Sequence, residues 1–377
     1  MAGFNWYRRL SRKSKRKQLA SQWLDVDGGD LAPLQSYLQQ CLAEGEFAQV
    51  ETFFEELPPD DRLPLDAYPA LIEISYQAGL YPRGLKLAEA WMRRDPETVG
   101  PLHQAARLHA LLGRFEQAHE LHRLALERDR GQAESWYQFG CTLLREERVE
   151  DAVGALREAL DRDSRLGKAY TNLGFALDRR GDTEGAIQQF KRAIQLDPNN
   201  AAGHYNLGAI YAERGEFELA IRLFNRALDL DPTSLEARLN LGLALFNSGS
   251  HAPAIREFEK VLRRHAENGE AWFYLGVSLS RLGAHNRALG AFQKARRFFD
   301  EDPRVLHYLG LCHLARNDHQ KALGHFQQVR ELNPEDGRNH YYLGIVYDKL
   351  GKTDLAEQSY RRAETLGHRE LSRSAHP

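Results

Sequence analysis

The sequence predicts an all-α solenoid built from one small helical hairpin that is repeated many times. A glycine recurs every 34 residues, an alanine follows twelve residues after each glycine, and a bulky residue follows four residues later. A fixed period of this length is typical of stacked units, none of which can bury its apolar face alone. The glycines are Gly140, Gly174, Gly208, Gly242, Gly276, Gly310 and Gly344; the alanines are Ala152, Ala186, Ala220, Ala254, Ala288, Ala322 and Ala356; the bulky residues are Leu156, Phe190, Phe224, Phe258, Phe292, Phe326 and Tyr360.

Residues 201–234 show the elements of one unit. His204, Leu207 and Tyr211 follow the spacing of one buried helical stripe. Gly215 interrupts that helix, because glycine supplies turn geometry. A second stripe follows, and Pro232 ends it because proline cannot continue a helix. Numbered within such a unit, the recurring glycine is position 8, the alanine position 20 and the bulky residue position 24. We expect the small residues to let two helix backbones approach, and position 24 to fill the space between repeats.

These positions resemble the signature of the tetratricopeptide repeat family. Trp136, Phe139 and Gly140 match its front half, and Ala193 and Pro198 match part of its back half. The resemblance implies a right-handed superhelix of helix-turn-helix repeats of 34 residues, which binds partners in a concave groove lined by the first helices.

The same frame extends upstream with weaker matches, so the sequence predicts about ten repeats between residues 31 and 370. Terminal repeats of such arrays are commonly atypical because one face meets solvent. The predicted parts are a basic segment 1–30, three divergent repeats 31–64, 65–98 and 99–132, seven well-matched repeats over 133–370, and a tail 371–377.

Composition limits the function. The formal net charge is only −2, and Cys41, Cys141 and Cys312 lie in separate repeats without a CxxC pair. This cysteine use predicts a reducing compartment, and no apolar run reaches the length of a membrane span. We therefore expect a cytoplasmic protein. Segments outside the repeats are too short for a catalytic domain, and no phosphate-binding loop, nucleophile elbow or HExxH is present. We expect neither an enzyme nor a cofactor.

The first 20 residues combine aromatic residues with seven Lys or Arg and no acidic residue. Four interpretations remain open: docking to an anionic membrane or an acidic partner, nucleic-acid binding, a mitochondrial transit peptide, and a solvated tail. In the first, the protein is peripherally membrane-associated. The candidate docking residues are Trp6, Tyr7, Arg8, Arg9, Arg12, Lys13, Lys15, Arg16 and Lys17.

The predicted inner face changes its chemistry along the chain. In the family, positions 2, 5, 6, 9, 12 and 13 line the groove. Here position 6 carries five carboxamides and then three tyrosines. A carboxamide both donates and accepts, so it can hold the backbone of an extended peptide; tyrosines supply rigid interface area. A structural role for the carboxamides at the helix surface stays open as well. The candidate partner-binding residues are Gln104, Gln138, Asn172, Asn206, Asn240, Tyr205, Phe246, Phe273, Tyr274, Tyr308, Tyr341 and Tyr342.

Two other kinds of site are disfavoured. Charges on the predicted groove are mixed, which argues against a nucleic-acid track. Histidines at His251, His285 and His319 recur one repeat apart, too far to share one metal ion. His109, His119 and His122 lack a carboxylate or cysteine that completes a recognisable metal site, so we expect no metal.

The sequence therefore predicts a non-catalytic scaffold or assembly factor that binds an extended segment of a protein partner in its groove. The alternative is a regulatory or substrate-recruiting subunit of an enzyme supplied in trans, for example a glycosyltransferase. Self-association through the last hairpin stays open.

Overall fold

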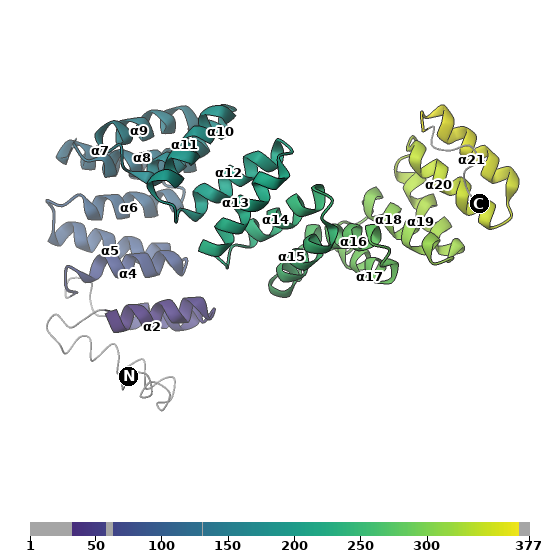
Figure 1. The fold of residues 1–377 in the computed structure, drawn as a ribbon. Helices are drawn as coiled ribbons and strands as arrows, with labels where there is room; N and C mark the ends of the chain where they lie inside the picture. Colours follow the sequence, from purple (N-terminus) through teal and green to yellow (C-terminus); the bar gives the residue numbers. More distant parts are fainter. Residues whose placement is uncertain (1–31, 58–62, 130, 369–377) are drawn as a thin grey trace. The chain divides into compact units, whose positions relative to one another are not determined.

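A computed structural model describes residues 32–57, 63–129 and 131–368, and every regular element in these ranges is an α-helix (Figure 1). The predicted basic segment with its docking residues, from Trp6 to Lys17, and the tail 371–377 lie outside the described residues. The helices fall into two compact units that divide between Asp197 and Pro198 and are described separately.

Within the described ranges, each unit contains five helical hairpins in chain order. In the first unit the helices are α2 (Ala32–Ala43), α3 (Phe47–Glu56), α4 (Ala67–Gln77), α5 (Tyr81–Arg94), α6 (Gly100–Leu111), α7 (Phe115–Arg128), α8 (Ala133–Arg145), α9 (Val149–Arg162), α10 (Gly167–Arg179) and α11 (Thr183–Leu196). In the second unit they are α12 (Ala201–Glu213), α13 (Phe217–Leu230), α14 (Leu235–Asn247), α15 (His251–Arg264), α16 (Gly269–Arg281), α17 (His285–Ala295), α18 (Pro303–Ala315), α19 (His319–Leu332), α20 (Gly337–Lys349) and α21 (Thr353–Thr365).

The turn inside each hairpin needs a residue in the left-handed region. Glycine supplies it in most repeats, and Gly215, for example, has a φ of 77°. Two repeats lack glycine at this position, and there Glu147 and Asn317 adopt φ values of 63° and 60°. A side chain in this conformation is strained, less so for asparagine than for glutamate.

The first helices of the second unit begin at recurring side-chain caps. Asn200, Ser234, Asn268, Asp302 and Asp336 each accept a hydrogen bond from a backbone N–H two or three residues further on. These are the residue types that cap helix N-termini best, because their short side chains reach the free N–H groups. The 34-residue period therefore fixes where each of these helices starts.

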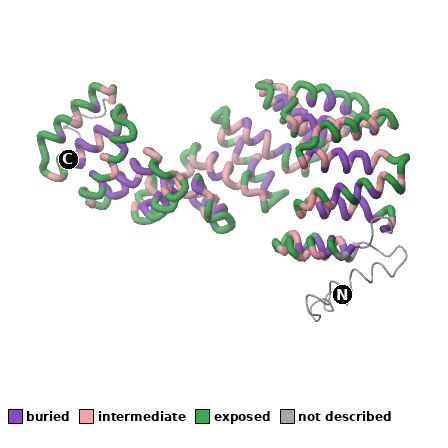
Figure 2. The backbone as a smooth tube through the Cα atoms, turned by 180° about the vertical axis from the view of Figure 1, so that it is seen from behind, coloured by how far each residue is buried: buried purple, intermediate pink, exposed green. Residues whose placement is uncertain are grey.

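The core runs along the inside of the hairpins (Figure 2). The seven alanines at position 20 are fully buried, and the position-24 residues from Leu156 to Phe326 are at most 1% exposed. The glycine at position 8 faces the ring of position 24 in its own hairpin: a Cβ on Gly242 would lie 2.6 Å from Cε1 of Phe258. The small residue thus makes room for the position-24 side chain, a leucine beside Gly140 and an aromatic ring in the later repeats.

Successive hairpins stack within each unit. The second helix of a hairpin packs against the first helix of the next, as α13 does against α14 and α15 against α16. First helices also contact one another, α12 with α14, α14 with α16 and α16 with α18. Within each unit, the side chains at positions 2, 5, 6, 9, 12 and 13 of the first helices of the hairpins form what we call the first-helix face.

Candidate functional site

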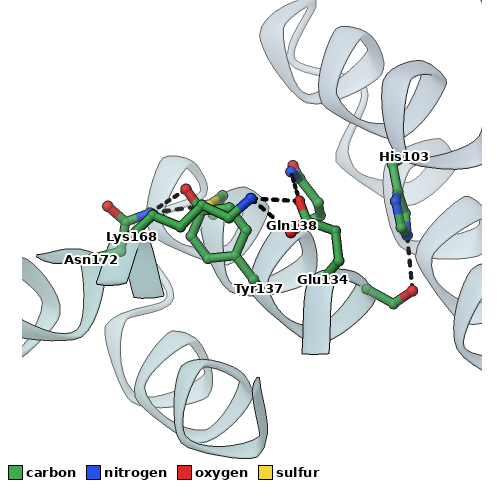
Figure 3. A network of polar contacts seen from close by, with 8 residues as sticks. His103, Glu134, Tyr137, Gln138, Lys168 and Asn172 are labelled. Atoms are coloured by element: carbon green, nitrogen blue, oxygen red, sulfur yellow. Dashed lines mark hydrogen bonds and ion pairs between the residues drawn. The ribbon is translucent and has the colours of Figure 1, made fainter. Parts of the chain in front are cut away.

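In the first unit the first-helix face carries a polar network between α8 and α10 (Figure 3). Glu134 accepts a hydrogen bond from Gln138 Nε2 at 2.7 Å and pairs with Lys168 Nζ at 2.7 Å. The Lys168 ammonium also lies 4.5 Å from the centroid of the Tyr137 ring. The charges of Glu134 and Lys168 are thus paired, and the Gln138 amide already has a partner.

Asn172 joins this network from α10. Its amide nitrogen lies 3.1 Å from Cys141 Sγ and 3.5 Å from the Tyr137 hydroxyl, both in the preceding hairpin. Burial raises the pKa values of Tyr137 and of the Cys141 thiol, so both groups stay protonated. The arrangement links two hairpins through neutral hydrogen bonds and provides no nucleophile.

Buried histidines of the first unit are held by hydroxyl groups. His103 Nε2 lies 2.9 Å from Ser135 Oγ, and His122 Nε2 lies 2.8 Å from Thr142 Oγ1. Burial lowers the pKa of His122 to about 3. No group of three or more His, Cys, Asp or Glu within the described ranges could hold a metal ion. Beside His103, Gln104 keeps its buried Oε1 without a hydrogen-bond partner.

Asn240 repeats the same contact in the second unit. Its Nδ2 lies 3.0 Å from the Tyr205 hydroxyl of the preceding hairpin, and the Tyr205 ring contacts Phe224. Asn206 lies half-buried on α12. In Asn172 and Asn240 the carboxamide donor predicted to hold a peptide backbone is therefore directed at a neighbouring repeat.

The three position-6 tyrosines are instead held by their rings. Tyr274 stacks on Phe258, Tyr308 on Phe292 and Tyr342 on Phe326, with ring centroids 6.1, 5.2 and 5.7 Å apart. In each pair the phenylalanine is position 24 of the preceding hairpin. The three tyrosines are half-buried, and their hydroxyls make no hydrogen bond with the described part of the chain. Each phenol is therefore fixed in position and still able to donate.

Ring contacts continue from one hairpin to the next and form what we call the aromatic strip. Its centroid distances are 5.3 Å for Phe246–Tyr274, 5.8 Å for Phe273–Tyr308 and 5.2 Å for His307–Tyr342. Such separations are those of favourable aromatic pairs. The strip comprises Phe246, Phe273, Tyr274, His307, Tyr308, Tyr341 and Tyr342.

His307 belongs to this strip although the sequence analysis did not select it. It occupies position 5, like Phe273 and Tyr341, and this shared position was the signal that could have identified it. Its ring is 6% exposed, and neither nitrogen has a hydrogen-bond partner among the described residues. Burial lowers its pKa to about 4, so the ring is neutral and packs as an aromatic group.

The charged groups beside the strip are mainly cationic. The Arg304 guanidinium lies 5.4 Å from the Phe273 centroid and pairs with Asp302, and that of Arg338 lies 5.9 Å from the Tyr342 centroid. Arg281 is exposed on the same face. The strip therefore presents aromatic surface with positively charged donors at its margin.

Comparison with family models agrees with this architecture. Models described as "TPR repeat" match residues 179–213 and 208–249, and models described as "Tetratricopeptide repeat" match residues 99–122, 239–303 and 308–369. Together they cover more than half of the chain. The chain is a tetratricopeptide repeat protein. Such proteins generally mediate protein–protein interactions, and their repeats bind protein or peptide partners.

The fold is shared with solved structures whose TM-scores exceed 0.5. A chain of the APC/C hetero-tetramer Cut9–Hcn1 is 14% identical, with 93% of this chain and 64% of that chain covered and a TM-score of 0.51. The C-terminal part of a TPR repeat-containing protein from Cytophaga hutchinsonii is 16% identical, with 61% and 95% covered and a TM-score of 0.51. YrrB, described as a TPR protein with an unusual peptide-binding site, is 24% identical, with 49% and 95% covered and a TM-score of 0.44. A comparison with curated protein sequences finds no match.

Among the described helices, none combines the length and the apolar composition that a membrane span requires.

Proposed function

We propose that this tetratricopeptide repeat protein is a non-catalytic scaffold or assembly factor that holds an extended segment of a partner protein along the aromatic strip of its second unit. The observation that carries the proposal is the state of the three position-6 tyrosines. Their rings are fixed by stacking, while their hydroxyls keep their hydrogen-bonding capacity. Rigid aromatic groups with a free polar end are common anchors at protein interfaces.

The polar network of the first unit is a less favourable binding site than the aromatic strip, because its groups already have partners. Glu134 and Lys168 neutralise each other, and Asn172 donates within the protein. A partner that bound there would first have to replace contacts that already exist, and this replacement would offset part of the binding free energy. The aromatic strip requires no such exchange at Tyr274, Tyr308 or Tyr342.

Peptide display on the full-length chain tests the proposal. Peptides that the chain selects should bind the Tyr308→Ala variant about 10-fold or more weakly, because an aromatic anchor at an interface commonly contributes this much. Tyr170→Ala is the matched control, since Tyr170 is another half-buried tyrosine and lies in the first unit. Circular dichroism would check that both variants stay folded.

The outcomes separate the candidate faces. Equal binding of the selected peptides by wild type and Tyr308→Ala would contradict the proposal. If Asn172→Ala abolished their binding while Tyr308→Ala did not, the site would instead lie on the polar network of the first unit.

A further inference from the structure

The first-helix face between residues 270 and 349 offers more hydrogen-bond donors than acceptors. The tyrosine hydroxyls can each donate and also accept, whereas Arg281, Arg304, Arg338 and Lys349 can only donate. Position 9 contributes the half-buried apolar residues Leu311 and Ile345, and position 12 contributes Leu314. No carboxamide occupies position 6 in these three repeats.

Apart from the tyrosine hydroxyls, the side-chain acceptors on this part of the face are few and lie toward its ends. Glu270 is at position 2 of α16. Asp348, near the end of α20, already accepts a hydrogen bond from the Tyr360 hydroxyl at 2.9 Å. Ser280 interacts with the Cys312 thiol. An ordinary extended peptide would therefore place those backbone N–H groups that do not reach a tyrosine hydroxyl against apolar side chains, where an unpaired donor is unfavourable.

We infer that the segment bound by the aromatic strip is proline-rich and adopts the polyproline II conformation, an inference that rests on the proposed function. Proline has no N–H to leave unpaired, and its carbonyl oxygens can accept from the tyrosine hydroxyls. Its ring packs on aromatic side chains, and the conformation exists before binding, so little chain entropy is lost.

The repeat distances of the two partners also agree. A polyproline II helix has three residues per turn and rises ~3.1 Å per residue, so equivalent residues recur every ~9 Å. Helices in contact lie ~8–10 Å apart, and α16, which carries Tyr274, contacts α18, which carries Tyr308. Two residues of the segment that lie three positions apart can thus face these two tyrosines.

Titration of the full-length chain with two blocked peptides tests this inference. One is a proline peptide of about nine residues, long enough for three polyproline II turns. The other has the same length, with every second proline replaced by alanine, which restores N–H donors. We expect the proline peptide to bind about 10-fold more tightly, because this face offers few acceptors to the added N–H groups.

A conservative variant locates the contact. Tyr274→Phe, Tyr308→Phe and Tyr342→Phe combined remove three hydroxyls and leave the stacked rings in place. Affinity for the proline peptide should fall about 10-fold or more, whereas the Tyr170→Phe control should leave it unchanged. Equal or tighter binding of the alanine-containing peptide, or no effect of the triple variant, would overturn the inference.

Failure of the inference can be told apart from failure of the proposed function. If display-selected peptides bind in a Tyr308-dependent way while the proline peptide does not bind, the strip is a binding site and its occupant is not proline-rich. If no selected peptide depends on Tyr308, both proposals fall.

Discussion

The ring of Tyr308 lies 5.2 Å from the ring of Phe292 in the preceding hairpin, with the two planes only 11° apart. Phe292 is completely buried, so the tyrosine covers one edge of the core between two hairpins. The ring of Tyr308 thus contributes to packing, whereas its hydroxyl remains available. The two contributions can be separated by substitution.

Removal of the Tyr308 ring should destabilise the protein more than removal of its hydroxyl. We expect Tyr308→Ala to lower the free energy of unfolding by about 1–2 kcal/mol, because a half-buried ring and its stacking are lost. Tyr308→Phe should cost less than about 0.5 kcal/mol, since no internal hydrogen bond is broken. Urea unfolding followed by circular dichroism measures both values, and equal losses would show that the hydroxyl has an internal partner.

The contact between Asn240 and Tyr205 should contribute to stability. A double-mutant cycle of Asn240→Ala and Tyr205→Phe should give a coupling free energy of about 0.5–1 kcal/mol, the usual value for one hydrogen bond between neutral groups. The quantity to measure is the free energy of urea unfolding of wild type, both single variants and the double variant. Additive effects of the two substitutions would mean that the contact is not populated in solution.

Substitution of alanine for either of two glycines should change the stability of the protein in opposite directions. Gly242→Ala places a Cβ 2.6 Å from Phe258, whose ring cannot move without disturbing the core, so we expect a loss of about 1–3 kcal/mol. Gly290 lies exposed in α17, and nothing would touch an added Cβ. Gly290→Ala should raise stability by about 0.5–1 kcal/mol through helix propensity. Similar effects of the two changes in thermal unfolding would contradict this account of position 8.

Replacement of Glu147, the left-handed residue of its turn, by glycine should stabilise the protein. Glu147→Gly relieves the backbone strain at a φ of 63°, which we expect to stabilise the protein by about 0.5–1 kcal/mol. The pair with Arg179 at 3.6 Å is exposed and contributes little. Asn317→Gly is the matched comparison and should gain less, because asparagine tolerates this conformation better. A larger gain for Asn317→Gly in the same urea experiment would reverse the explanation.

Acid should destabilise the protein through His122. Its pKa lies near 3 in the folded chain and near 6.5 when unfolded, so the unfolded state binds more protons between these pH values. The free energy of unfolding therefore falls as the pH drops below 6.5, by about 2 kcal/mol from this residue at pH 5. His122→Gln should remove this share of the pH dependence, whereas His265→Gln, at an exposed position, should not. Parallel pH profiles for wild type and His122→Gln would show that His122 does not carry the effect.

Much of the fold follows from the period, because positions 20 and 24 have the same surroundings in every repeat. The all-helical hairpin architecture and the family were predicted correctly on that basis. The divergent repeats were harder to define, since Gly84 replaces the alanine and its neighbours differ.

The candidate site was less predictable. Asn172 and Asn240 occupy the position expected of peptide-binding residues, yet each donor meets a group 31 or 35 residues earlier in the chain. Which way a side chain turns depends on what the neighbouring hairpin offers, and the spacing of residues alone does not contain this information. His307 could have been selected from position 5, which it shares with Phe273 and Tyr341, but only the three rings that bury it reveal that it packs as an aromatic group. Whether either set of residues binds a partner stays a prediction.

The stacking of each position-6 tyrosine across a hairpin boundary has a mechanical consequence. A segment bonded to Tyr274, Tyr308 and Tyr342 would hold rings that each rest on the hairpin before them. It would bridge three successive boundaries between hairpins and make this stretch of the array more resistant to extension. Force that pulled the hairpins apart would in turn increase the distances between the three hydroxyls, so that the segment could no longer bind all of them. Tension along the array would therefore favour release of the partner.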